Sequence, residues 1–138
     1  MFPEITFSQF LFFELMFVII WSISIIIHEF GHYIPAYIMG FKPKINIIST
    51  NHFQVEYHSN NLRVLQRLMI TSMGVISGFT VLLFWSIVLF SSDVLVFLMF
   101  GILPLIGYLW CARGDVIHIF LSLQILKCQG NILLKDEP

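Results

Sequence analysis

Charged side chains are scarce in this chain of 138 residues. Only 11% of the residues are charged, whereas 58% are hydrophobic, and the mean hydropathy is +0.90. A soluble domain carries about a quarter charged residues, so the composition predicts an integral membrane protein. The formal net charge of −1 offers no basic surface for nucleic acid. We therefore expect the lipid bilayer as a partner, and no nucleic acid.

Cysteine is equally rare, with Cys111 and Cys128 as the only two. Two cysteines cannot build the disulfide framework of a small secreted domain, and their spacing does not match that of a zinc-binding cysteine pair. The chain also lacks internal repeats and low-complexity linkers. We therefore predict a single integral-membrane domain over residues 1–138.

Long apolar runs dominate the chain and predict three membrane-spanning segments, at residues 9–39, 68–90 and 94–126. At about 1.5 Å per residue, the first and the third are longer than a bilayer core of about 30 Å, so each must tilt or break. Pro104 marks the expected break in the third segment, because proline removes a backbone hydrogen-bond donor. The predicted fold class is an all-α membrane protein, a transmembrane bundle of three or four helical spans.

A polar stretch separates the first two predicted spans. Residues 53–58 alternate between apolar and polar, which is typical of a half-buried strand, and residues 44–48 are rich in β-branched side chains. Turn-forming residues lie between these two runs. We predict a small β-hairpin over residues 44–58, lying at the membrane surface. His52 and His58 are interpreted as solvated hairpin residues rather than as metal ligands.

Lysine and arginine are distributed unevenly around the predicted spans. Six of the seven lie between the first two spans or after the last one, namely Lys42, Lys44, Arg63, Arg67, Lys127 and Lys135. Only Arg113 falls inside a span. The positive-inside rule therefore predicts that the hairpin and the C-terminus face the cytoplasm and the N-terminus faces outside, in the cytoplasmic membrane.

The residues with the clearest chemistry are His28-Glu29-Phe30-Gly31-His32, inside the first predicted span. Two histidines four apart on a helix point the same way and can hold one zinc ion. Glu29 follows the first histidine, an offset that lets its carboxylate reach a zinc-bound water as a general base. Ionisable groups at membrane depth are rare and usually functional. The alternative is two buried histidines that are hydrogen-bonded to neighbouring helices.

A catalytic zinc site takes three protein ligands and one water. Asp115 is the only aspartate within an apolar segment, and its predicted depth in the membrane is similar to that of His32. We predict Asp115 as the third ligand. The alternative is an ion pair with Arg113, although residues two apart on a helix face different directions. His118, one turn further on, is predicted either to support the site or contact a reaction intermediate, or to be an ordinary buried histidine.

These residues resemble the site-2 protease family of intramembrane zinc metalloproteases. The sequence from His28 to His32, followed by Ala36 and Gly40, is similar to the first family motif, and the predicted hairpin follows in the family position. The second family motif ends in Leu-Asp-Gly-Gly-His. Here Gly114-Asp115-Val116-Ile117-His118 keeps the aspartate and the histidine but lacks the two glycines after the aspartate.

Between the two motifs lies Met73-Gly74-Val75-Ile76-Ser77-Gly78. Its glycines form a small-residue face that allows close approach of another helix. In the family, this region often reads Gly-Pro-x-x-Asn, and the asparagine is thought to polarise the scissile carbonyl. The chain keeps only the first glycine of that pattern. Ser77 is our candidate here for supporting the site or stabilising an intermediate.

The chain looks still more like a smaller family of zincin-type membrane peptidases. The likeness extends to the end of the chain, where a glycine–aspartate pair, an apolar helix and a lysine precede Asp136-Glu137-Pro138. It covers most of the chain from about residue 20. The resemblance implies a Zn²⁺ metalloprotease that hydrolyses peptide bonds of membrane-associated substrates, in or next to the bilayer. A membrane protein or peptide is then the expected substrate, and a homo-oligomer or a regulatory membrane partner is compatible with it.

Two other interpretations stay open. The first is a non-catalytic membrane protein that retains the motif to bind zinc or a partner protein, and the missing asparagine favours it. The second is a purely structural helical membrane subunit without a metal. Metal content separates the second interpretation from the others, and the effect of replacing Glu29 separates the enzyme from the first.

Overall fold

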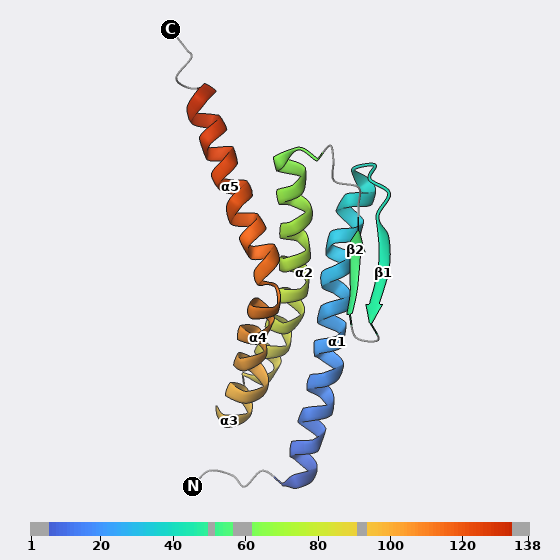
Figure 1. The fold of residues 1–138 in the computed structure, drawn as a ribbon. Coiled ribbons are helices and arrows are strands. Elements are labelled where there is room, and N and C mark those ends of the chain that lie inside the picture. Colours follow the sequence, from blue (N-terminus) through green and yellow to red (C-terminus); the bar gives the residue numbers. More distant parts are fainter. Residues whose placement is uncertain (1–5, 50–51, 57–61, 91–93, 134–138) are drawn as a thin grey trace.

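The computed structural model describes most of the chain, namely residues 6–49, 52–56, 62–90 and 94–133. Two long helices run side by side (Figure 1), α1 over Phe7–Ile38 and α2 over Val64–Leu89. They correspond to the first two predicted spans. The second begins earlier than predicted, because the helix starts directly after Arg63 and includes the polar turn that carries Arg67.

Local sequence sets both ends of α1. The side chain of Thr6 accepts a hydrogen bond from the backbone of Gln9, and the Gln9 side chain accepts one from the backbone of Thr6 at 3.0 Å. This reciprocal pair satisfies two backbone donors at the start of the helix. At the other end Gly40 has φ of 83°, a conformation that favours glycine. The chain therefore leaves α1 directly into the hairpin.

The third predicted segment is divided into four consecutive pieces, namely α3 (Val94–Val96), the π-helix η1 (Phe97–Ile102), α4 (Leu103–Cys111) and α5 (Arg113–Leu133). Pro104 lies in the first turn of α4, where proline is well tolerated. The sharp change of direction comes later, at Ala112, where the helices on either side are bent by 61°. The irregularity near Pro104 is thus a transition from π-helix to α-helix, and the bend lies between α4 and α5.

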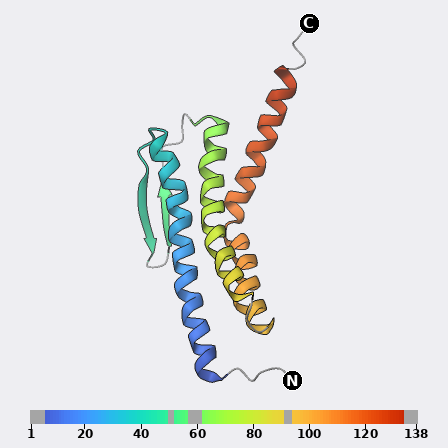
Figure 2. The same cartoon turned by 180° about the vertical axis from the view of Figure 1, so that it is seen from behind.

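A two-stranded antiparallel sheet follows α1. Strand β1 covers Lys44–Ser49 and β2 covers His52–Glu56. The predicted hairpin over residues 44–58 is therefore present as far as the end of β2, while His58 lies outside the described residues. Strand β2 contacts α1 and is the strand nearer to it (Figures 1 and 2). The location of the hairpin at a membrane surface stays a prediction.

Helix α2 is the central element, in contact with α1, η1, α4 and α5. The contacts are filled by two apolar clusters, which surround Leu82, Tyr108 and Ala112 in one case and Leu89, Val96 and Phe100 in the other. Helix α5 leans away from the other helices toward its C-terminal end (Figures 1 and 2). Only the first part of α5 therefore lies against the core of the bundle.

Glycine lets α1 and α2 approach closely. A Cβ added at Gly31 of α1 would lie 2.8 Å from the Cα of Gly74 in α2, which is too close for two carbon atoms. A Cβ at Gly74 would overlap the ring of His32, and one at Gly78 would overlap the hydroxyl of Tyr108. The small-residue face predicted for the second span therefore admits both a helix backbone and two polar side chains.

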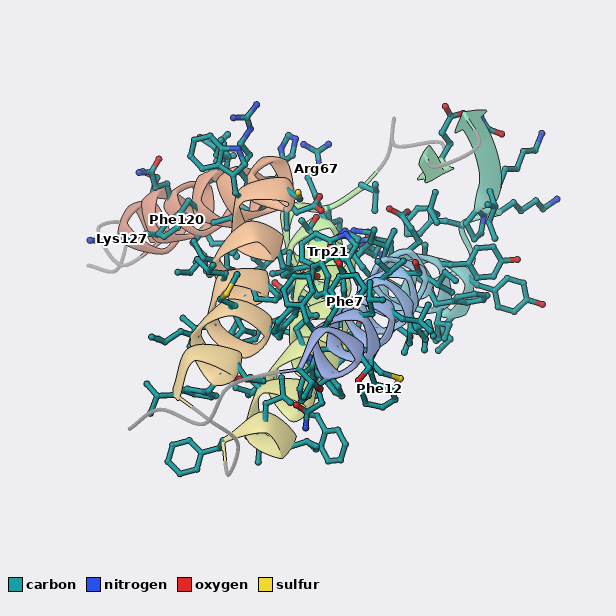
Figure 3. The ribbon with its side chains drawn as sticks, turned by 90° about the horizontal axis from the view of Figure 1, so that it is seen from below. Phe7, Phe12, Trp21, Arg67, Phe120 and Lys127 are labelled. Carbon is teal, nitrogen blue, oxygen red and sulfur yellow. The ribbon has the colours of Figure 1, made fainter. Side chains whose placement is uncertain are left out.

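Most large apolar side chains face outward. Phe7 is 77% exposed and Phe84 is 69% exposed. In a view along the helices, Phe12 points away from the bundle, whereas Trp21 lies between the helices (Figure 3). An apolar exterior of this kind suits a lipid environment rather than water.

Two helices, α1 and α2, are each long and apolar enough to cross a membrane. The bent pair formed by residues 97–111 and 113–128 is a third candidate if it is counted as one span. The described residues therefore contain two or three candidate spans, by length and composition. The predicted helical membrane architecture agrees with this, whereas the predicted number of three or four spans stays a prediction.

Candidate metal centre

Helix α1 presents two imidazole rings on one face. His28 and His32 lie one turn apart, with ring centroids 4.6 Å apart and Nε2 atoms 3.1 Å apart. Both side chains are nearly enclosed, at 12% and 11% exposed. The spacing follows from the helix itself, because residues four apart are neighbours on its surface.

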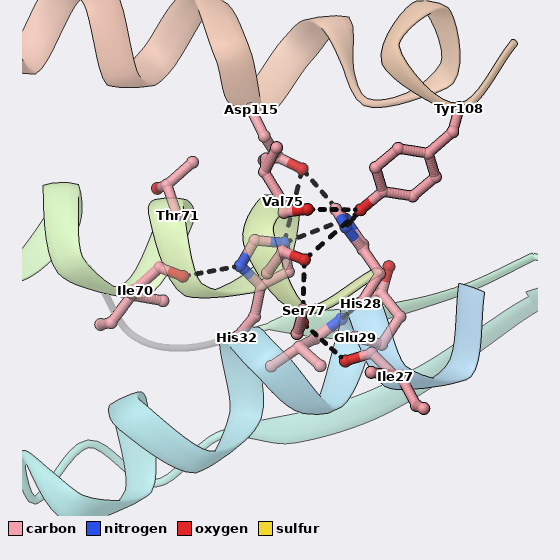
Figure 4. A network of polar contacts seen from close by, with 12 residues as sticks. Ile27, His28, Glu29, His32, Ile70, Thr71, Val75, Ser77, Tyr108 and Asp115 are labelled. Atoms are coloured by element: carbon pink, nitrogen blue, oxygen red, sulfur yellow. Dashed lines mark hydrogen bonds and ion pairs between the residues drawn. The ribbon is translucent and has the colours of Figure 1, made fainter. Parts of the chain in front are cut away.

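Asp115 completes the group from a different part of the chain. Its Oδ2 lies 3.1 Å from Nε2 of His28 and 3.4 Å from Nε2 of His32 (Figure 4). The residue belongs to the first turn of α5, immediately after the bend at Ala112. Its side chain is 30% exposed, so the group is more open on this side. The structure therefore brings together the three residues that were predicted as ligands.

The outer nitrogen of His32 is held by helix α2. Its Nδ1 lies 3.0 Å from the carbonyl oxygen of Ile70, an atom that can only accept a hydrogen bond. The proton of a neutral His32 must therefore be on Nδ1, which leaves a lone pair on Nε2. The absence of a side chain at Gly74 makes the space that this ring occupies.

The outer nitrogen of His28 is held by a tyrosine. Nδ1 of His28 lies 2.7 Å from the hydroxyl of Tyr108, and that hydroxyl donates to the carbonyl oxygen of Val75 at 3.0 Å. Because the hydroxyl has only one proton to donate, we assign His28 Nδ1 as the donor to the tyrosine oxygen. His28 then also carries its lone pair on Nε2, directed at Asp115.

The three converging atoms are therefore all electron-pair donors. An ionised carboxylate and two imidazole lone pairs repel one another unless a cation lies between them. A tetrahedral zinc site with ligands about 2.0–2.1 Å from the metal has neighbouring ligand atoms about 3.3 Å apart. The separations here are 3.1, 3.1 and 3.4 Å. The donor set and its spacing fit a zinc ion with one coordination position left for water.

Arg113 does not take part in this group. Its guanidinium carbon lies 5.2 Å from the ring centroid of Trp110, in a cation–π arrangement, and its side chain is exposed. The ion pairs of Asp115 are with the two histidines. The geometry thus favours the ligand interpretation of Asp115 over the ion pair with Arg113.

Glu29 lies next to the histidines in α1 but its carboxylate is tied to the hairpin. Its Oε2 accepts a hydrogen bond from the backbone N–H of Val55 in β2, at 3.1 Å. The Glu29 side chain is partly buried. The residue predicted as general base is therefore close to the predicted ligands, and its carboxylate is hydrogen-bonded to a strand.

Ser77 and His118 are the two supporting residues predicted from the sequence. The hydroxyl of Ser77 lies 3.0 Å from the carbonyl oxygen of Ile27 and 2.9 Å from that of Gly74, so it joins α2 to α1. His118 is exposed on α5, and no hydrogen bond links it to the three ligands among the described residues. Their chemical roles stay predictions.

Sequence reasoning did not single out Tyr108 or Val55. Tyr108 is a tyrosine in an apolar helix whose hydroxyl needs a partner once it is buried, and that is the signal by which it could have been found. No local sequence pattern predicts the contact of Val55, because the residue makes it through its backbone N–H.

Comparison with protein-family models, curated proteins and solved structures finds no match for this chain. The geometry of the site and the motif around Glu29 are therefore the features that bear on function.

Proposed function

We propose that this protein is a membrane-embedded zinc metalloprotease in which His28, His32 and Asp115 hold the metal. One observation carries the proposal. Three electron-pair donors, contributed by two distant segments, converge at the separations that zinc ligands require. The resemblance of the motif around Glu29 to site-2 proteases supplies the reaction class, which is hydrolysis of peptide bonds.

Each residue then has a distinct task. A bound zinc ion would supply Lewis acidity, activating water and polarising the scissile carbonyl. Glu29 takes the proton from the attacking water and passes it to the leaving amine. Tyr108 and the carbonyl of Ile70 keep the two imidazoles in the tautomer that can bind a metal.

The helices give this chemistry a location. The proposed ligands His28, His32 and Asp115 are called the metal group below. With α1 and α2 crossing a bilayer, the two histidines of this group lie in the half of α1 nearer to the hairpin. The distribution of lysine and arginine supports the proposal that this half lies on the cytoplasmic side of the cytoplasmic membrane. The substrate would be a membrane-associated protein or peptide, and β2 offers a strand edge on which an unwound segment can pair.

The second candidate function is a non-catalytic membrane protein that binds zinc or a partner protein. The placement of Ser77 favours it, because its hydroxyl is engaged by two backbone carbonyls rather than directed to the metal group. The described part of the chain has no asparagine at the family position, so no side-chain amide is available there to polarise a carbonyl.

Metal analysis of the purified full-length protein tests the proposal first. We expect about one zinc per chain in wild type and a loss of zinc in Asp115→Ala. Gln124→Ala is the matched control, since it removes an exposed polar side chain from the same helix and should leave zinc in place. Iron in place of zinc, or no metal in wild type, contradicts the proposed centre, because two histidines and one carboxylate also suit non-haem iron.

Glu29→Gln then separates the enzyme from the binding protein. The variant keeps all three ligands, so zinc content should equal that of wild type. Cleavage of labelled membrane peptides should fall by at least about 10²-fold, the lower end of what a general acid–base group contributes. Equal cleavage by wild type and variant would remove Glu29 from the mechanism. A zinc-loaded wild type without any cleavage would favour the binding protein.

A further inference from the structure

The hydrogen bond from Val55 to Glu29 joins the strand to the proposed general base. The backbone N–H of Val55 lies 3.1 Å from Glu29 Oε2, and Val55 itself is 7% exposed. A general base must direct a carboxylate oxygen at the water that it deprotonates. In the observed arrangement, one oxygen of that carboxylate is engaged by the hairpin instead.

The register of the sheet shows which edge of β2 is involved. Val55 is opposite Ile45 in β1, and its N–H leaves the sheet toward Glu29. In an antiparallel pair, the N–H and C=O of one residue point to the same side. Both backbone groups of Val55 therefore face the free edge of β2, away from β1. An edge of this kind is a template for another strand.

The carboxylate of Glu29 takes one hydrogen-bonding position that a neighbouring strand would use at the edge of β2. A carboxylate oxygen about 3 Å from an edge N–H makes the contact that a carbonyl oxygen of an added strand would make. The carboxylate of Glu29 thus accepts the hydrogen bond that a peptide carbonyl would otherwise accept at this edge, and Glu29 is also the proposed general base. Pairing of an added strand at Val55 and the hydrogen bond to Glu29 exclude each other, because the N–H is a single donor.

We propose that an extended peptide segment displaces Glu29 from Val55 when it pairs with the free edge of β2. A carbonyl oxygen of the peptide takes the N–H, and the released carboxylate turns to the metal group. The exchange itself needs only the hairpin and Glu29, while its catalytic consequence rests on the proposed function. Docking and activation of the base then become one event.

The exchange selects for backbone conformation. The backbone groups of an intact transmembrane helix are hydrogen-bonded along its own axis, so they cannot form the row of inter-strand bonds that an added strand makes along β2. An unwound segment can form that row, and its carbonyl then takes the N–H of Val55. The substrate class is therefore an extended stretch of peptide, recognised mainly through its backbone, and intact helices in the bilayer leave the base engaged.

Peptide binding to the purified full-length protein in detergent tests the exchange. The probe is a fluorescent nonapeptide of alternating threonine and valine, and its control carries N-methyl groups on alternate peptide bonds, which blocks strand pairing. We expect the plain peptide to bind and the methylated one not to bind. Glu29→Gln should bind the plain peptide about fivefold more tightly, because a neutral oxygen competes less well for the N–H than a charged one.

Glu56→Gln is the matched control, because it removes the same charge from an exposed position at the end of β2. Its affinity for the peptide should equal that of wild type. The amide resonance of Val55 in ¹⁵N-valine-labelled protein gives a second readout. It should shift on Glu29→Gln in the free protein and should not shift when the peptide is bound.

Three results would overturn the exchange, namely no binding of the plain peptide, equal affinity of wild type and Glu29→Gln, or an amide shift that is the same with and without peptide. None of these measurements needs zinc or hydrolysis. A protein that shows the exchange but lacks metal or cleavage retains this inference and loses the proposed function. A protein that holds zinc and cleaves peptides without the exchange loses only the inference.

Discussion

The hydroxyl of Tyr108 lies 2.7 Å from Nδ1 of His28, and this contact decides which ring nitrogen of the histidine faces Asp115. Tyr108 belongs to α4 and is 4% exposed, with its ring packed against Leu82 and Ala112. A metal ligand of this kind usually donates its second ring N–H to a neighbouring group, which orients the ring. Tyr108 is thus a positioning residue of the proposed centre.

Tyr108→Phe tests that role, because it removes the hydroxyl and keeps the packed ring. We expect zinc affinity to fall by about 10–100-fold, the usual cost of losing such a partner. Competition with a zinc-chelating dye measures it. Tyr37→Phe, on an exposed residue of α1, should leave the affinity at the wild-type value. Unchanged affinity in Tyr108→Phe would show that the ring of His28 is oriented by other contacts.

Gly74→Ala should disturb the metal centre from the side of α2. Its Cβ would overlap the ring of His32, so the imidazole must leave its observed position beside His28. We expect zinc affinity to fall by about tenfold or more. Gly114→Ala is the control, because a Cβ there meets nothing within 4 Å and alanine favours the helix by up to about 1 kcal/mol. Normal zinc binding by Gly74→Ala would contradict the observed position of His32.

Removal of the metal should loosen the link between α1 and α5. Zinc bound as proposed, by residues of both helices, would stabilise the folded state by about 2.7 kcal/mol when its concentration is 100 times the dissociation constant. A chelator should therefore lower the thermal unfolding midpoint of wild type, and added zinc should restore it. Asp115→Ala should start from the lower midpoint and show no further decrease. If the chelator leaves the thermal unfolding midpoint of wild type unchanged, no metal joins the two helices.

Cysteine labelling tests the orientation in the membrane. Starting from a variant in which Cys111 and Cys128 are replaced by serine, a single cysteine is introduced in place of Lys42 or Phe90, two exposed residues. A membrane-impermeant reagent added to intact cells should label position 90 and not position 42. The reverse pattern would place the hairpin outside and contradict the proposed orientation.

The amino-acid sequence by itself determined the helices and the part of the site that lies on α1. Long apolar runs must form helices wherever lipid cannot satisfy the backbone, and that requirement is local. The spacing of His28 and His32 places both on one face of any helix that contains them. The alternating pattern likewise predicted the hairpin, which is observed as far as Glu56.

Only the tertiary structure decided how distant segments meet. Asp115 reaches the histidines because the chain bends at Ala112 rather than at Pro104. Ser77 bonds to a helix backbone, and Val55 to Glu29, because of how closely the elements pack. These contacts depend on how the helices cross and on the register of the strand. The local pattern of residues predicts neither of these. The sequence therefore indicated which side chains are candidates for the proposed chemistry, and the packing of distant segments determined which of them lie in one site.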